Sequence, residues 1–279
     1  MLQERRQNEI IQILQRKEEI RVSEITKLFG VSQNTIRRDL KELERMGLVK
    51  KVYGGAVINE KFPTPDLPYR IRESSMIEEK REIGLIASKL IQNGENIILD
   101  LGTTTLEIAK NLHKKAHLTI ITNNFSIVEE LRGNPHIHVI VAGGEYRETA
   151  KGCVGYYTEE FFSKVHQVDR TFLSCGGITP ERGIMNPTHH ELKTKREMIR
   201  AGREVYVVAT SEKIGKTSFA SFCSLSEIDA IITDKHIPEV KIQTFQKLGI
   251  RIIREQKDES KIGPEGSENR YSKKTDPIN

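Results

Sequence analysis

Six short apolar runs, each separated from the next by a stretch of helical character, occupy the chain between residues 96 and 233. Continuous β-rich runs that alternate with helices are typical of a mostly parallel sheet covered on both faces. The sequence therefore predicts an α/β fold for residues 71–255. The predicted strands lie at residues 96–100, 119–122, 139–142, 171–174, 204–208 and 230–233.

A proline-rich segment divides the chain before this region. Pro63, Pro65 and Pro68 stand within six residues and disfavour both helix and sheet, so we expect an extended linker at residues 61–70. The preceding residues 1–60 are dense in charge and helical periodicity and predict a separate unit. The last stretch is polar and lacks an apolar pattern, which predicts a disordered tail at residues 256–279.

Composition excludes several classes of protein. Cys153, Cys175 and Cys223 are widely spaced and odd in number, which excludes a disulfide framework and a Cys-x-x-Cys motif. No run approaches the roughly 18 apolar residues of a membrane span, and the N-terminus is charged instead of apolar. We therefore expect a cytoplasmic protein with no membrane association, no metal and no cofactor.

Residues 22–58 carry the signals of a winged helix-turn-helix. A short amphipathic helix begins at Val22 and is closed by Gly30, and Ser32 is placed to cap a second helix. The second helix has an apolar face. After this helix, two short apolar runs flank Gly54-Gly55, a turn signal between two strands. The predicted buried face of that helix consists of Ile36, Leu40 and Leu43.

The polar side of this unit has the chemistry that reads duplex DNA. A helix fits the major groove with its first residues at base edges, where Gln or Asn pairs with adenine and Arg with guanine. Lysines outside the groove hold phosphates. Charge alone is more typical of a solvated face, but a capped helix followed by a basic hairpin favours DNA. The residues predicted to contact DNA are Ser32, Gln33, Asn34, Thr35, Arg37, Arg38, Lys41, Lys50, Lys51 and Tyr53.

Two strand-to-helix turns in the α/β region offer donors for an anion. Asp100 and Gly102 precede a run of three threonines at residues 103–105, which places backbone N–H groups and hydroxyls at a helix N-terminus. A second polar turn, residues 122–124, follows the next strand. Loops at the carboxyl ends of parallel strands converge, so the two turns can share one ligand. Helix capping by threonine is the alternative, and it needs no ligand.

The same motifs carry a family resemblance. The string at residues 32–40 and the Val-Tyr-Gly-Gly-Ala wing at residues 52–56 resemble the DeoR family of bacterial transcriptional regulators. The resemblance continues to about Asp234. It implies that the larger domain binds a sugar phosphate and is related in fold to ribose-5-phosphate isomerase.

The resemblance also implies where the effector binds. Lys213 matches a late lysine of the family, and Glu191 and Lys195 match its Glu…Lys helix. The chain departs from the family at Gly176, Thr188 and Thr210, where acids are usual. Together with candidates from the loops themselves, the predicted effector residues are Asp100, Gly102, Thr103, Thr104, Thr105, Thr122, Asn123, Asn124, Arg147, Lys151, Gly176, Gly177, Glu191, Lys195 and Lys213.

We therefore predict a DNA-binding transcriptional regulator, a repressor and not an enzyme, whose operator binding is modulated by a phosphorylated sugar or related metabolite. A short recognition helix gives limited specificity, so we expect a homo-oligomer that reads repeated half-sites. Two alternatives remain: a sugar-phosphate isomerase-like enzyme with an appended DNA-binding domain, and a regulator that senses a non-phosphorylated ligand. The Gly215-Lys216-Thr217 string lacks the earlier glycine of a nucleotide-binding loop.

Overall fold

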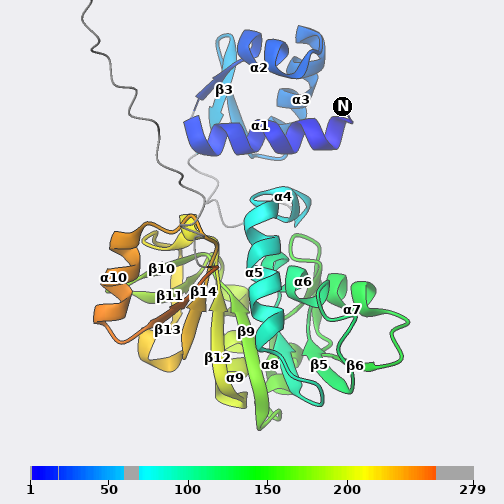
Figure 1. The fold of residues 1–279 in the computed structure, drawn as a ribbon. Coiled ribbons are helices and arrows are strands. Elements are labelled where there is room, and N and C mark those ends of the chain that lie inside the picture. The colour runs from blue at the N-terminus through cyan, green and yellow to red at the C-terminus, as the bar shows by residue number, and fades with distance from the viewer. Residues whose placement is uncertain (1, 18, 60–68, 256–279) are drawn as a thin grey trace, which may run out of the picture.

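The computed structural model describes residues 2–17, 19–59 and 69–255, which form a small N-terminal unit and a larger α/β unit (Figure 1). In the N-terminal unit the helices pack on a three-stranded antiparallel sheet of order β1-β3-β2. The predicted winged helix-turn-helix is therefore present. Its elements are α1 (Gln3–Lys17), β1 (Glu19–Arg21), α2 (Val22–Phe29), α3 (Gln33–Arg45), β2 (Val49–Val52) and β3 (Gly55–Ile58).

The local signals of helix α3 act as the sequence predicts. Ser32 is the N-cap, and its hydroxyl accepts a hydrogen bond from the Thr35 backbone N–H at 3.2 Å. Gly30 closes α2 in the left-handed conformation at φ +64°, where glycine is free of strain. The predicted apolar face of α3 is buried in a core shared with α1.

The wing differs from the prediction at its turn. The turn consists of Tyr53 and Gly54, and Gly55 belongs to β3, where it pairs with Arg21 of β1. The sequence did not reveal β1. A Cβ at position 55 would lie 2.0 Å from the Ile20 carbonyl oxygen, so the close approach of this third strand requires glycine there.

The larger unit is built on a seven-stranded parallel sheet of order β15-β14-β12-β9-β4-β5-β6. All six predicted strands belong to it, and the α/β prediction is confirmed. The seventh strand, β15, was not predicted. The strands are β4 (Asn96–Leu99), β5 (Leu118–Thr122), β6 (Ile137–Val141), β9 (Val168–Ser174), β12 (Gly202–Val208), β14 (Ala230–Ile232) and β15 (Arg251–Ile253).

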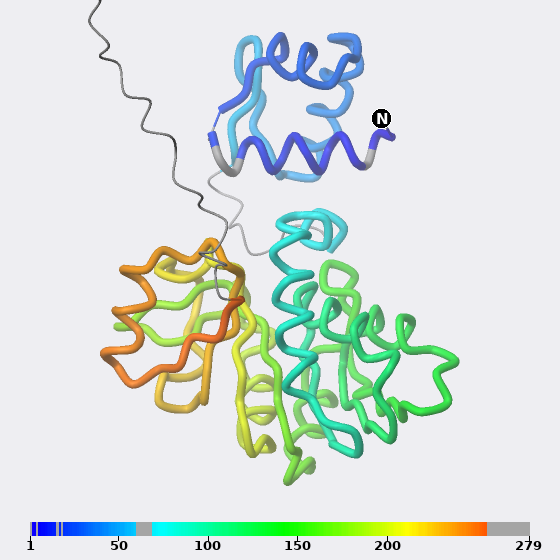
Figure 2. Tube along the Cα trace, in the orientation of Figure 1, coloured from blue at the N-terminus to red at the C-terminus, as the bar shows by residue number. Residues whose placement is uncertain are grey.

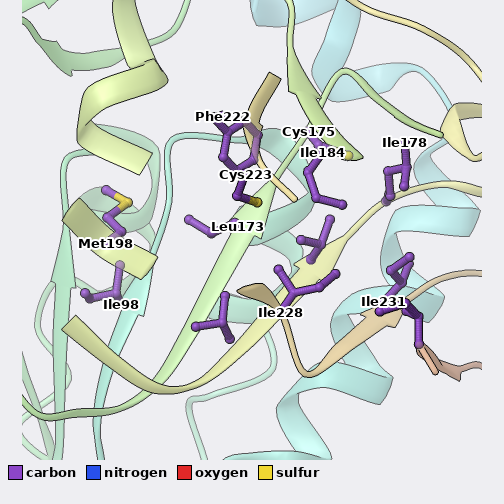
Figure 3. Close-up of a cluster of buried hydrophobic side chains, with 14 of the residues drawn as sticks. Ile98, Leu173, Cys175, Ile178, Ile184, Met198, Phe222, Cys223, Ile228 and Ile231 are labelled. Carbon is purple, nitrogen blue, oxygen red and sulfur yellow. The ribbon is translucent and has the colours of Figure 1, made fainter. Parts of the chain in front are cut away.

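Helices cover both faces of this sheet. Helices α5, α6 and α7 share one apolar core with Ile97 and Leu99 of β4, whereas Ile98 of the same strand faces a second core with α8, α9 and α10. Figure 3 shows part of the second core, which includes Ile98, Leu173, Met198 and Phe222. The helices are α4 (Tyr69–Ser74), α5 (Ile77–Leu90), α6 (Thr103–Ala109), α7 (Phe125–Leu131), α8 (Tyr156–Ser163), α9 (Leu192–Ala201) and α10 (Glu239–Lys247).

Smaller elements outside the parallel sheet were not predicted. They form an antiparallel sheet of order β10-β11-β13, a β7-β8 hairpin and short 3-10 helices. Their bounds are β7 (Glu145–Arg147), β8 (Gly152–Val154), β10 (Gly177–Thr179), β11 (Gly183–Asn186), η2 (His189–Glu191), η3 (Ser211–Lys213), β13 (Ala220–Cys223) and η4 (Leu225–Glu227).

The linker prediction is wrong at its C-terminal end. Residues 61–68 and the tail predicted at residues 256–279 lie outside the described residues, but Tyr69 and Arg70 begin helix α4. Tyr69 is buried, and α4 packs against α1 and α6. The tube in Figure 2 passes through this short cyan helix between the two units. Within the described residues, no helix has the length and apolarity needed to cross a membrane.

Candidate functional site

The first turns of α3 present polar side chains to solvent. Gln33, Asn34, Arg37, Arg38 and Lys41 are all exposed. Their exposure follows from the burial of the opposite face of α3 in the core of the N-terminal unit. The helix therefore offers donors and acceptors along one solvent-facing side, which is the arrangement that direct base readout needs.

The acids of this region are already engaged, which leaves several cations without an acid partner. Asp39 is fully buried, and both of its oxygens accept hydrogen bonds from Arg6 of α1. Glu42 pairs with Arg45 at 2.7 Å, and Glu44 pairs with Lys51 at 3.2 Å. Among the described residues, the cations that form no ion pair here are Arg37, Arg38, Lys41 and Lys50.

The wing carries two lysines and an exposed aromatic ring. Lys50, Lys51 and Tyr53 are exposed. Lys51 forms an ion pair with Glu44. The tip is anchored because the Val22 backbone N–H donates to the Gly54 carbonyl at 2.9 Å. This bond ties the wing to the start of α2, so hairpin and helix pair form one body.

In the larger unit, the loop after β4 is held by its own threonines. Thr105 donates its hydroxyl to the Asp100 carbonyl at 2.7 Å and to the Gly102 carbonyl at 2.9 Å. Its hydroxyl is therefore engaged within the loop, as the capping alternative expects. Thr103 opens α6 and its hydroxyl lies 3.4 Å from the Arg72 carbonyl.

The loop after β5 meets the first loop, as predicted. Asn124 donates its amide to the Gly102 carbonyl at 3.1 Å. Thr122 donates to the Leu99 carbonyl at 2.6 Å, and Asn123 donates to the Cys153 carbonyl at 2.8 Å. These bonds fix the two loops together. The Asn123 Oδ1 atom is buried and has no hydrogen-bond partner within the described part of the chain.

Asp100 and Lys195 form a buried ion pair at the centre of these loops. The Asp100 carboxylate also accepts hydrogen bonds from the Ser174 backbone N–H at 2.9 Å and the Ser174 hydroxyl at 2.8 Å. Glu191 lies 3.6 Å from the Lys195 Nζ atom. Burial raises the pKa of Glu191, although Lys195 opposes the shift. The Glu191–Lys195 pair is therefore no ordinary surface pair, because Lys195 is fully buried.

Two further lysines approach the same loops without a carboxylate partner. Lys80 of α5 is 4% exposed and donates to the Arg72 carbonyl, and Lys213 donates to the Cys175 carbonyl at 2.9 Å. Neither forms an ion pair among the residues that the structure describes. Burial, followed by repulsion from Lys213 and Arg72, lowers the pKa of Lys80 to about 7. Burial also lowers the pKa of Lys213.

Sequence reasoning missed Lys80 and Arg72. The signal for Lys80 was its place on the apolar stripe of α5, where it is buried with Ile83, Gly84 and Ala87. A lysine on a buried face requires an explanation because lysine is almost never fully buried unless it is paired. Arg72 had no comparable signal, since it stands in a one-turn helix.

The remaining predicted residues border this cluster. Arg147 donates to the Thr149 hydroxyl at 2.9 Å and lies near enough to Glu191 to oppose the rise of its pKa, and Lys151 stands 4.7 Å above the Tyr69 ring. A Cβ on Gly177 would lie 2.3 Å from the Lys216 carbonyl oxygen, so this glycine serves close packing.

The positions where the resemblance expects acids also have a distinct environment. A Cβ on Gly176 would lie 2.5 Å from the Ser218 Oγ atom and 2.8 Å from the Pro187 ring. The hydroxyl oxygens of Thr188 and Thr210 are buried, and within the described residues they have no hydrogen-bond partner. Position 176 therefore has little room for a side chain, whereas the two threonines carry unused hydrogen-bonding capacity.

A winged helix-turn-helix joined to an α/β unit with a cationic loop cluster defines a ligand-responsive DNA-binding regulator. The chain belongs to the DeoR family of transcriptional regulators: the DeoR-like helix-turn-helix domain matches residues 6–62, and the DeoR C terminal sensor domain matches residues 75–235. The predicted family is confirmed, and with it the prediction of a DNA-binding transcriptional regulator instead of an enzyme.

The alignments with curated relatives span almost the whole length of those proteins. The chain is 35% identical over 250 residues to the HTH-type transcriptional regulator GolR of Listeria innocua, which covers 88% of this chain and 96% of that protein. It is 32% identical over 245 residues to the glycerol-3-phosphate regulon repressor of Escherichia coli, with coverage of 88% and 96%. It is 34% identical over 239 residues to the lactose phosphotransferase system repressor of Staphylococcus epidermidis, with coverage of 85% and 94%.

Solved structures match only distantly. A D-ribose-5-phosphate isomerase in complex with phospho-erythronic acid aligns with a TM-score of 0.37 and 14% identity, and covers 50% of this chain and 54% of that chain. A Pyrococcus horikoshii translation initiation factor eIF-2B aligns with a TM-score of 0.39 and 15% identity, with coverage of 72% and 68%. The predicted relation to the isomerase fold stays a prediction.

Proposed function

We propose that the protein is a repressor whose operator binding changes when a phosphorylated sugar or related metabolite binds between α5, α6 and η3. The observation that carries this proposal is that Lys80 and Lys213 donate only to backbone carbonyls and form no ion pair among the described residues, while Lys213 is near enough to lower the pKa of Lys80. Two mutually repelling ammonium groups beside a helix N-terminus are stabilised when a dianion enters. Two relatives carry names that refer to glycerol 3-phosphate and to the lactose phosphotransferase system.

The phosphate end of the ligand belongs at the loop after β4. The backbone N–H groups of residues 102–104 lie at the start of α6, and Thr105 holds the loop in shape through its own hydrogen bonds. Lys80 and Lys213 supply charge at the same place. The two lysines, with the backbone N–H groups and hydroxyls of the loop, match the requirements of a phosphate group.

The sugar end belongs near Glu191, Thr188 and Thr210. The two threonine hydroxyls are buried without partners among the described residues, and a ligand hydroxyl would satisfy them. These orphaned hydroxyls also support the second candidate, a non-phosphorylated polyol as effector. Asp100 is engaged by Lys195 and Ser174, so it orders the loop and does not contact the ligand as a free carboxylate.

On the DNA side, α3 enters the major groove with the predicted contact residues, and Lys50, Lys51 and Tyr53 of the wing lie along the phosphates. The DNA-binding domain is residues 1–60 and the effector domain residues 71–255. The regulator acts in the cytoplasm. It is a homo-oligomer, because one short helix reads too few base pairs to select an operator.

Thermal denaturation of the full chain with sugar phosphates and their unphosphorylated counterparts tests the effector class. A ligand at about 100 times its Kd stabilises the folded state by about 2.7 kcal/mol, which corresponds to about 5–10 °C for a domain of this size. We expect such a shift from at least one phosphorylated compound. Shifts from unphosphorylated compounds alone would establish the second candidate and overturn the phosphate assignment.

The pH dependence of anion binding gives a separate prediction. Burial and the nearby cations Lys213 and Arg72 lower the pKa of Lys80 to about 7, so its charged fraction rises as the pH falls from 8 to 6. Sulfate remains a dianion over this range, and we expect calorimetric titration to show about tenfold tighter binding at pH 6 than at pH 8. The Lys80→Met variant should lose most of this dependence. Equal sulfate affinity of the native chain at both pH values would contradict the role of Lys80.

A further inference from the structure

Helix α4 is the element that touches both the DNA-binding unit and the proposed anion site. It spans only Tyr69–Ser74 and follows the undescribed segment 60–68. Figure 1 shows it at the top of α5, facing α1. A one-turn helix makes few hydrogen bonds of its own, so its position depends on its neighbours.

On one side, α4 is part of the DNA-binding unit. Ile71 is 5% exposed and belongs to the apolar core formed by α1, α3 and the small sheet. The side-chain amide of Gln12 in α1 donates to the Ser74 carbonyl at 3.2 Å. A displacement of α4 would therefore remove an apolar side chain and a hydrogen bond from the unit that carries α3.

On its other side, α4 uses donors that belong to the anion site. The Arg72 carbonyl accepts a hydrogen bond from Lys80 Nζ, and the Thr103 hydroxyl lies 3.4 Å away. The Arg72 guanidinium donates to the Thr149 carbonyl at 2.7 Å. The backbone of α4 is thus held by the same lysine and the same loop that the proposed phosphate would occupy.

We infer that α4 couples the two sites because the anion and the Arg72 carbonyl compete for Lys80 and Thr103. This inference rests on the proposed function of the loop site. When a phosphate enters, the lysine ammonium and the threonine hydroxyl turn to its oxygens, which are stronger acceptors than a carbonyl. The Arg72 carbonyl then loses the contacts from Lys80 and Thr103, and α4 shifts as its hold on the loop weakens.

The movement of α4 changes the DNA-binding unit through Ile71 and Ser74. A ligand shifts an equilibrium only through contacts that differ between two states, and here the differing contacts are those of the Arg72 carbonyl. Helix α4 therefore contacts the anion site through Lys80 and Thr103, and it contacts the DNA-binding unit through its own Ile71 and through Gln12 of α1.

Hydrogen–deuterium exchange of the full chain, in inorganic phosphate and in sodium chloride of equal ionic strength, tests this coupling. We expect phosphate to slow exchange of the amides at residues 103–106. We expect it to accelerate exchange about 2- to 10-fold at residues 73–76 and in the middle of α1. Slower exchange at residues 103–106 with no change in α4 or α1 would overturn the coupling and leave the anion site standing. No change at residues 103–106 would overturn both.

Variants separate coupling from simple loss of stability. In Ile71→Ala and in Gln12→Ala, phosphate should still slow exchange at residues 103–106, but its effect on α1 should fall to less than half. Val49→Ala is the matched control, because Val49 is buried in the same core from strand β2. If Val49→Ala reduces the response of α1 as much as Ile71→Ala and Gln12→Ala do, α4 is not the route.

Discussion

The Asp39→Ala variant is expected to lower the free energy of unfolding of the N-terminal unit by about 3–5 kcal/mol. Asp39 is fully buried, and its two oxygens accept hydrogen bonds from Arg6, the longer at 3.1 Å. Removal of the carboxylate takes away both hydrogen bonds and the negative charge that Asp39 supplies to the buried Arg6 guanidinium. Hydrogen exchange of the amides of α1 and α3 in the full chain measures the loss locally.

Two variants control this result. The double variant Arg6→Met, Asp39→Leu removes both charges, and we expect it to recover most of the lost stability because apolar pairs often replace buried ion pairs without loss. Glu42→Ala removes an acid from the same helix, but that acid forms an exposed pair with Arg45, so we expect its loss to have little effect on stability. A cost for Asp39→Ala no larger than that for Glu42→Ala would show that the buried pair does not stabilise the unit.

The second large effect is expected on DNA binding. Arg37→Ala and Arg38→Ala should each weaken binding to the duplex upstream of the protein's own gene by about 1–3 kcal/mol, or roughly 5- to 150-fold. Both arginines are exposed on α3 and, among the described residues, neither forms an ion pair. Fluorescence anisotropy at fixed salt measures the change.

The salt dependence of each variant separates the kinds of contact. A base contact should be lost mainly for the specific duplex, whereas a phosphate contact should weaken specific and random duplexes alike and reduce the salt slope by about one. Arg200→Ala is the control, because Arg200 is an exposed arginine of α9 paired with Glu197. Equal affinities for the Arg37, Arg38 and Arg200 variants would exclude α3 as the recognition helix.

The elements that the sequence predicted are those with a strong local pattern. The face of Ile36, Leu40 and Leu43, the cap at Ser32 and the six buried strands are each visible within a few residues. Strand β1 and helix α4 are three and six residues long, and each exists because of a partner far along the chain. No local pattern encodes such partners.

The candidate site was predicted in part for the same reason. Hydroxyls and glycines in loops are local signals, and the loops around Gly102 and Asn124 do meet. Whether a side chain is free or engaged depends on tertiary contacts: Thr105 holds its own loop, and Asp39, an acid of helix α3, is buried against Arg6. Lys80 stands on helix α5 and not in a loop, and only its burial in the structure identifies it as a candidate site residue.

The central claim is that a phosphorylated metabolite changes operator affinity. Its most direct test is the affinity of the full chain for the upstream duplex, at constant ionic strength, with and without the sugar phosphate that stabilises the protein most. We expect binding at least about 10³-fold tighter than to random duplex. We also expect a change of about 5- to 150-fold on saturation with that compound and none with its unphosphorylated counterpart. If the sugar phosphate binds the protein but leaves its operator affinity unchanged, this result would contradict control of DNA binding by a phosphorylated metabolite.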